Sequence, residues 1–282
     1  MLNNILTNKL ALGTVQFGLD YGISNNSGQV AKEDVLEIIN IASLYGITAL
    51  DTASKYGNAE DILGNIHLNR FDIVTKFIPE TKELTLEKQL INSLNNLKIS
   101  QVYGYIAHEP KYVFEQKNVW DKLNKFKEQG KVKKIGFSFD YPDEYFIMKK
   151  KGFIPDLVQL PYNYFDKRFL IIMERLKQKG CEIHTRSPFL QGLFFLDSNN
   201  LSTQFNSVKS IIRNLQLTHK ALLQGALLKF VLKNALIDKV VFGVQNKSQL
   251  ISNIESVTMA SDLDELKMHV ENNIVQPSKW VK

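Results

Sequence analysis

The sequence has almost no cysteine: Cys181 is the only one among 282 residues. A single thiol cannot form an intramolecular disulfide, which is typical of proteins from a reducing compartment. Long apolar runs are also missing, since the longest are of strand length and a membrane span needs roughly 18 residues. The first nine residues contain no apolar core of signal-peptide length. We therefore expect a soluble, cytoplasmic protein with no membrane partner.

Metal and phosphate motifs are absent too. Besides His108, the histidines lack ligand-like spacing with Cys, Asp or Glu, so we expect no metal site. No Gly-x-Gly-x-x-Gly fingerprint follows the first predicted strand, which argues against a Rossmann domain. The formal net charge is +6 with scattered basic residues, so we expect no nucleic-acid partner. Such a mild positive field can still attract a phosphorylated cofactor or an anionic substrate.

What the chain does have is a regular alternation of strand and helix patterns. Apolar runs typical of buried strands start near residues 10, 47, 71, 102, 134, 157, 182 and 239. A helical pattern follows each, and strands alternating with helices indicate a parallel sheet. Eight units without a linker favour a single-domain (β/α)8 TIM barrel over residues 1–282, rather than an open doubly wound sheet.

The helical patterns are predicted from apolar spacing and from glycine or proline at their ends. They cover residues 32–45, 58–67, 85–97, 119–128, 142–150, 167–179, 208–235 (with a break near Thr218) and 247–257. Outside the eight units we expect a short N-terminal hairpin that pairs residues 5–6 with 9–10. We also expect an extra C-terminal helix over residues 263–271 and irregular structure over residues 188–203.

Four polar residues lie at or just after the ends of neighbouring predicted strands: Asp51, Tyr56, Lys76 and His108. In a barrel all strands point their C-terminal ends at one face, where the βα loops build the active site. We therefore expect these side chains to meet. An ammonium beside a phenol favours the phenolate, so Tyr56 can exchange a proton with a carbonyl or alcohol oxygen. Asp51 would hold Lys76, and a neutral His108 would orient the carbonyl.

Motifs along most of the chain add a resemblance to these residues. They are 13–18 (GTVQFG), 51–60 (DTASKYGNAE), 75–76 (TK), 108–110 (HEP), 135–138 (IGFS), 159–163 (QLPYN), 187–192 (SPFLQG) and 242–246 (FGVQN), with Leu250 and Asn253. With these motifs in this order the chain resembles the aldo-keto reductases. The resemblance implies a (β/α)8 barrel, a nicotinamide cofactor and catalysis by the four residues above, with Tyr56 as the proton donor.

The resemblance also implies a cofactor site, with NADP(H) favoured and NAD(H) as the alternative. Ser138 and Gln159 match the residues that hold the nicotinamide carboxamide, although Phe139 stands where many relatives have asparagine. Arg186 takes the position of an aromatic residue that stacks on the nicotinamide. The remaining positions match the first strand end, the pyrophosphate loop and the adenosine end: Gly13, Thr14, Ser187, Leu190, Gly192, Gly243, Gln245, Gln249 and Asn253. Where NADP-binding relatives often have a basic residue this chain has Gln249, and Lys247 is the nearest cation.

Two functions are compatible with these residues. The first is an NAD(P)(H)-dependent oxidoreductase that interconverts a small aldehyde or ketone with an alcohol. The second is a barrel that binds the cofactor as a sensor or scaffold, as potassium-channel beta subunits of this family do. We expect the loops 20–30, 109–119 and 188–203 to select the substrate. Polar residues in the first, such as Asn25, suit a sugar-derived substrate. The sequence makes no prediction of oligomeric state.

Overall fold

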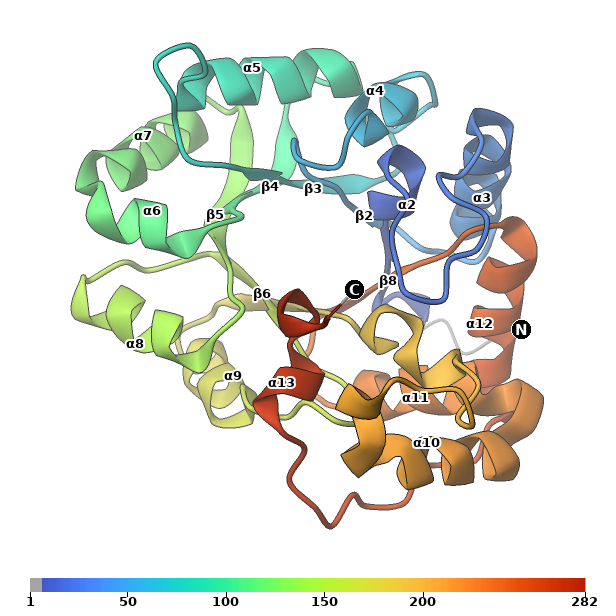
Figure 1. Cartoon of the computed structure of the whole chain (residues 1–282). Helices are drawn as coiled ribbons and strands as arrows, with labels where there is room; N and C mark the ends of the chain where they lie inside the picture. Colours follow the sequence, from blue (N-terminus) through green and yellow to red (C-terminus); the bar gives the residue numbers. More distant parts are fainter. Residues whose placement is uncertain (1–6, 282) are drawn as a thin grey trace.

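A computed structural model describes residues 7–281 and shows eight parallel strands closed into a barrel (Figure 1). Each strand pairs with the next in sequence, and Leu10 lies opposite Val240 where the first strand meets the last. The predicted eight units and their closure are confirmed. The strands are β1 (Leu10–Gly13), β2 (Ala49–Asp51), β3 (Asp72–Phe77), β4 (Val102–Ala107), β5 (Val132–Ser138), β6 (Leu157–Pro161), β7 (Glu182–Arg186) and β8 (Lys239–Gly243).

Helices surround the barrel on its outside (Figure 1). None of those within residues 7–281 is long and apolar enough to cross a membrane. The α-helices are α2 (Val15–Gly18), α3 (Lys32–Leu44), α4 (Ala59–Gly64), α5 (Leu86–Leu97), α6 (Pro110–Glu115), α7 (Lys117–Glu128), α8 (Pro142–Lys150), α9 (Leu170–Lys177), α10 (Asn206–His219), α11 (Leu223–Leu232), α12 (Lys247–Met259) and α13 (Asn272–Val275). The 3-10 helices are η1 (Leu190–Phe195), η2 (Thr203–Phe205), η3 (Lys220–Leu222) and η4 (Pro277–Lys279).

Helix α5 illustrates how local sequence sets these elements. The hydroxyl of Thr85 caps its N-terminus by accepting a hydrogen bond from Lys88 N at 3.3 Å. Leu86, Leu90 and Leu97 recur at helical spacing and are fully buried against the barrel. The interruption predicted near Thr218 is confirmed, since α10 ends at His219 and α11 begins at Leu223.

Some sequence-based expectations about the outer elements were wrong. Residues 263–271 form no helix: Leu263, Leu266 and Val270 contact a side-chain cluster beside the barrel, and Tyr164 Oη donates to Asp264 O at 3.0 Å. The short helices α2, α6, η1 and η2 lie in stretches expected to be loops. The first arm of the predicted hairpin, residues 5–6, lies outside the described residues, and no strand precedes Leu10 in the described part.

Small and branched apolar side chains fill the middle of the barrel. They form two clusters, one of Ala11, Ala49 and Val241 and the other of Val74, Ile106 and Leu157. Inward and outward residues alternate along each strand. The residues two positions after these cluster members therefore also point inward, and they lie nearer the C-terminal mouth of the barrel. The outward residues pack against the helices in the main hydrophobic core.

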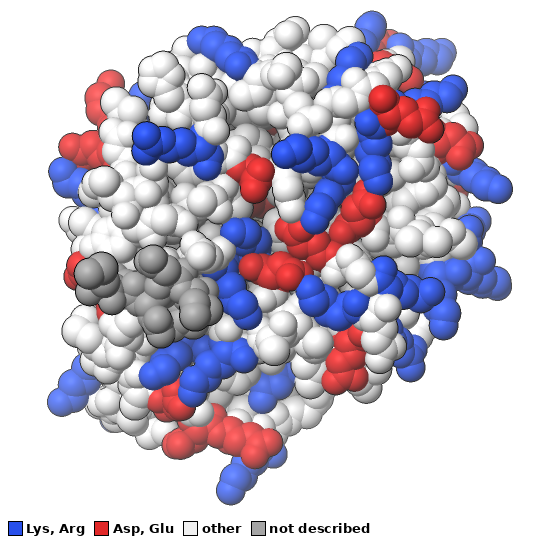
Figure 2. Space-filling model, turned by 180° about the vertical axis from the view of Figure 1, so that it is seen from behind, with Lys and Arg blue, Asp and Glu red and all other residues white. Residues whose placement is uncertain are grey.

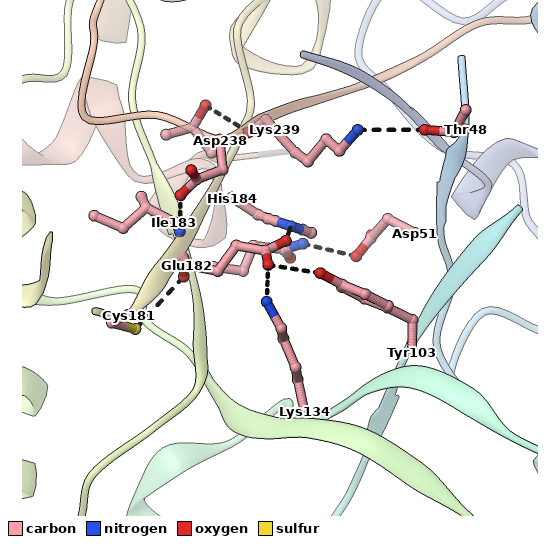
Figure 3. A network of polar contacts seen from close by, with 12 residues as sticks. Thr48, Asp51, Tyr103, Lys134, Cys181, Glu182, Ile183, His184, Asp238 and Lys239 are labelled. Atoms are coloured by element: carbon pink, nitrogen blue, oxygen red, sulfur yellow. Dashed lines mark hydrogen bonds and ion pairs between the residues drawn. The ribbon is translucent and has the colours of Figure 1, made fainter. Parts of the chain in front are cut away.

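The N-terminal end of the barrel interior is polar and ion-paired (Figure 3). Glu182 is bonded to Lys134, accepts from Tyr103 Oη at 2.7 Å and lies 2.6 Å from His184 Nε2. Burial alone would raise the pKa of Glu182, but the contacts with His184, Lys134 and Tyr103 lower it to about 2. On this side of the molecule, opposite to the view of Figure 1, basic and acidic side chains are intermixed (Figure 2).

Candidate active site

The candidate catalytic residues meet around the ammonium group of Lys76. Its Nζ donates to Asp51 Oδ2 at 2.7 Å, to Thr52 O at 3.0 Å and to Tyr56 Oη at 3.3 Å. The Lys76 side chain is 1% exposed. Burial disfavours the ammonium, but the charge of Asp51 and the contact with Tyr56 outweigh it and raise the pKa of Lys76. The ammonium is therefore fixed beside the phenol.

The carboxylate of Asp51 is held from two sides. Its Oδ2 accepts from Lys76, and its Oδ1 accepts from Gln159 Nε2 at 2.7 Å. The Asp51 carbonyl also accepts from the hydroxyl of Thr14 at 3.0 Å and from Thr14 N at 2.9 Å. Strands β1, β2, β3 and β6 are thus tied together at the mouth, and Thr14 braces the end of β2.

Tyr56 is positioned by a tight turn between β2 and α4. Tyr56 N donates to Ala53 O at 3.0 Å, and Ala59 N donates to Tyr56 O at 3.1 Å. Gly57 has φ +56°, and a Cβ there would lie 2.3 Å from Gly18 O. Only glycine allows this conformation with such a close backbone approach, which explains the Tyr56-Gly57 pair of the sequence motif.

His108 follows β4 and faces the phenol. Its ring lies edge-on to that of Tyr56, with the centroids 5.9 Å apart. Burial and then the positive charges of Lys76 and Arg186 lower the pKa of His108 to about 4. The imidazole is therefore neutral near pH 7. The structure thus brings Asp51, Tyr56, Lys76 and His108 together, as expected from the strand ends.

Buried polar atoms at the mouth lack partners within residues 7–281, among them Gln159 Oε1 and His108 Nδ1. A buried polar atom without a partner is costly, so each is available to a bound group. Gly13 and Gly243 lie opposite each other where β1 meets β8, and the side-chain amide of Gln16 lies against Gly243. The unpaired amide oxygen of Gln159 fits a hydrogen-bond donor such as the carboxamide of a nicotinamide ring.

Arg186 occupies the last position of β7, and its Nη2 donates to Phe139 O at 3.1 Å and pairs with Asp140. The side chain of Phe139 is fully buried in the outer core, where it stacks on Phe137 with centroids 5.7 Å apart. It therefore takes no part in the mouth, and the amide that many relatives carry at this position has no substitute here.

The predicted pyrophosphate loop after β7 has an unusual backbone. Ser187, Leu190, Gln191 and Gly192 all have positive φ, between +47° and +94°. Gln191 holds the loop after β1: its carbonyl accepts from Ile23 N at 3.0 Å, and its Nε2 donates to Tyr21 Oη at 2.8 Å. Strained backbone of this kind is often found at ligand sites.

Asn25, expected from the sequence to face a hydroxylated substrate, has another role. Its Nδ2 donates to Asp20 Oδ1 and Gly28 O, and its Oδ1 accepts from Ser27 N and Gly28 N. The side chain thus folds the loop 20–30 onto itself. In the same loop, burial and then the charge of the Tyr56 phenol raise the pKa of Tyr21.

A family model, described as "Aldo/keto reductase family", matches residues 9–271. The chain belongs to the aldo/keto reductase family. Membership implies an oxidoreductase that acts on carbonyl compounds with NAD(P)H. A comparison with curated proteins found no significant match.

Solved structures of other aldo-keto reductases share the fold. AKR11C1 from Bacillus halodurans, in its holo form, is 17% identical with a TM-score of 0.72, covering 91% of this chain and 88% of that one. The putative aldo-keto reductase PA4992 from Pseudomonas aeruginosa is 19% identical with a TM-score of 0.68, covering 89% and 90%. At this level of identity the likeness concerns the barrel alone.

In this aldo/keto reductase Gln245 and Gln249, two of the residues predicted for the adenosine end, lie at the start of α12. Asn246 caps the helix by accepting from Gln249 N at 2.9 Å, and Gln249 Oε1 accepts from Gln245 N at 2.8 Å. Lys247, the nearest cation, is paired with Glu37 of α3 at 3.0 Å. Gln245 and Gln249 are thus neighbours, but Lys247, the nearest cation, already forms an ion pair with Glu37.

Sequence reasoning missed several residues of this region. Asp140, which fixes Arg186, lies two residues beyond the end of β5, and its position after a strand was the available indication. Gln16 was matched only as part of a motif. Its buried Oε1 lacks a partner within the described residues, and its amide lies against Gly243, where a Cβ would come within 2.3 Å.

Proposed function

We propose that this protein reduces an aldehyde or ketone to an alcohol, or catalyses the reverse, with Tyr56 as the general acid and base. The observation that carries the proposal is the chain of contacts from Asp51 through Lys76 to Tyr56, at 2.7 and 3.3 Å. A buried ammonium at that distance stabilises negative charge on the phenol oxygen as its proton leaves. Proton transfer to the carbonyl oxygen then needs no further charged group.

Each remaining residue has a distinct task in this reaction. The neutral imidazole of His108 donates a hydrogen bond that orients the carbonyl and stabilises the developing oxyanion. Asp51 keeps Lys76 charged and in place. Gln159 Oε1 and Ser138 would hold the carboxamide of the nicotinamide. The bound dinucleotide supplies or accepts the hydride.

We propose NADP(H) as the favoured cofactor and NAD(H) as the alternative. The loop 187–192 would bind the pyrophosphate, and the start of α12 would bind the adenosine with Gln245, Gln249 and Asn253. Lys247 is the cation within this group that can reach a 2′-phosphate. Its pairing with Glu37 weakens that preference, because the carboxylate already neutralises the ammonium.

The test is the Tyr56→Phe variant, assayed with NADPH and a panel of small aldehydes by absorbance of the reduced nicotinamide. Loss of the proton donor should lower kcat by roughly 10²–10⁴-fold. Affinity for NADPH, measured by fluorescence titration, should stay within about twofold, because the phenyl ring keeps its place. Unchanged turnover would contradict the role of Tyr56. Tight cofactor binding by the native protein without turnover of any aldehyde would support a sensor or scaffold instead.

A further inference from the structure

Arg186 is a cation built into the rim of the catalytic mouth. It ends β7 at an inward-facing position, because it continues the alternation from Glu182 and His184, which face the barrel interior. Its side chain is 26% exposed, so it is largely enclosed but still reachable from solvent. Asp140 and the carbonyl of Phe139 both bond to the same nitrogen, Nη2. The group is therefore fixed at one end only.

The unused end of the guanidinium can bind a ligand. Arginine has five N–H donors, and those on Nε and Nη1 form no hydrogen bond with residues 7–281. Donors in such a planar fork match the geometry of a carboxylate or phosphate, which they bind through two parallel hydrogen bonds. Asp140, whose side chain is 62% exposed, orients the fork from the solvent side.

The electrostatic environment of the mouth points the same way. After burial, the groups that lower the pKa of His108 are Lys76, Arg186 and Lys55, and Asp51 opposes them. Lys76 is paired with Asp51, Lys55 with Glu109 at 3.5 Å and Arg186 with Asp140, but Arg186 keeps unused N–H donors on Nε and Nη1 within the described residues. Arg186 also acts on Tyr21, where its charge opposes the effect of burial on the pKa. The guanidinium thus adds positive charge to the surroundings of both His108 and Tyr21.

We propose that Arg186 binds a carboxylate or phosphate group of the substrate, so that the preferred substrates are anionic aldehydes or ketones. This inference rests on the proposed carbonyl reduction. It differs from the stacking role implied by the aromatic residue at this position in many relatives, because a stacked guanidinium needs no particular charge on the substrate. The acidic group of the substrate lies on the β7 side of the mouth, and its carbonyl lies between Tyr56 and His108.

The experiment compares matched substrates that differ in charge. Succinic semialdehyde is paired with butanal, and glyceraldehyde 3-phosphate is paired with glyceraldehyde. The readout is the ratio of kcat/KM for the anionic to the neutral member, because any effect on cofactor binding cancels in it. The native ratio should exceed 1 for at least one pair. Arg186→Met should lower that ratio by about 10- to 100-fold, as expected for a lost charged hydrogen bond.

Two further variants separate charge from structure. Arg186→Lys keeps the charge and should retain part of the preference. Arg213→Met removes an equal charge from the exposed face of α10 and should leave the ratio unchanged. A ratio that Arg186→Met leaves unchanged would overturn the inference and leave the proposed function intact. A change in the ratio for succinic semialdehyde and butanal would indicate a carboxylate ligand, and a change for glyceraldehyde 3-phosphate and glyceraldehyde would indicate a phosphate ligand.

A binding measurement keeps the inference testable without turnover. Isothermal titration calorimetry with glycerol 3-phosphate and glycerol, in the presence of the oxidised cofactor, should show tighter binding of the phosphate, and Arg186→Met should abolish the difference. If no aldehyde is turned over but this difference is found, the proposed function fails and the anion site stands. If the native protein binds both alcohols equally and shows no preference in kcat/KM, the anion site is refuted.

Discussion

The ion pair of Lys76 and Asp51 gives a sharp prediction about stability. The two side chains are 1% and 6% exposed, so each charge depends on the other for solvation. Lys76→Met leaves the Asp51 carboxylate buried, with only Gln159 Nε2 still donating to its carboxylate oxygens. Leaving one partner of a buried pair uncompensated costs about 3–5 kcal/mol. For a chain of 282 residues, whose entropy of unfolding is about 0.6 kcal/mol/K, this lowers Tm by roughly 5–8 °C.

The coupling between the two residues is the decisive quantity. In the double variant Lys76→Met/Asp51→Asn this pair leaves no buried charge, so the loss of stability should be at least about 2 kcal/mol smaller than the sum of the two single losses. Thermal unfolding followed by circular dichroism measures all four proteins. Losses that add within about 0.5 kcal/mol would refute the reasoning, since they would show that neither charge depends on the other.

Three further predictions concern the mouth and the cofactor. The pKa of His108 is about 4 in the folded protein and 6.5 ordinarily. As the pH falls, the unfolded chain therefore binds a proton at His108 before the folded protein does. The free energy of unfolding should fall by about 3 kcal/mol between pH 6.5 and 4. His108→Asn should lack this loss in urea unfolding at pH 7 and 4, and an equal loss would contradict the assignment. Gly192→Ala places a Cβ 1.9 Å from Ser24 Oγ at a residue with φ +94°, so it should strain the loop, lower Tm by a few degrees and weaken cofactor binding in fluorescence titrations; native affinity would contradict the role of this loop. Glu37→Gln frees Lys247 and should raise the NADP⁺ to NAD⁺ affinity ratio about two- to fivefold, as expected for an exposed ion pair, and a constant ratio would show that Lys247 does not reach the 2′-phosphate.

The strands and the meeting of the four candidate catalytic side chains could be predicted because each depends on local patterns. The apolar runs before Asp51, Lys76 and His108 mark strand ends, and barrel geometry places those ends together. The helix expected over residues 263–271 was wrong because its spaced leucines are satisfied by contacts with a cluster made from distant segments. The roles of Asn25 and Asp140 at the site could not be predicted for a similar reason. Their hydrogen-bond partners are chosen by loop conformation, which residue type and spacing do not determine.

The pairing of β1 with β8 closes the barrel between segments that lie far apart in the sequence. Asp51, Tyr56, Lys76 and His108 all lie in the first 108 residues, but Gln159 of β6 holds Asp51, and Gly13 of β1 meets Gly243 of β8. Closing a loop of about 230 residues adds entropic cost and raises contact order, which slows folding. A chain that ends before β8 would therefore contain all four candidate catalytic residues and still lack the strand that closes the barrel beside Gly13.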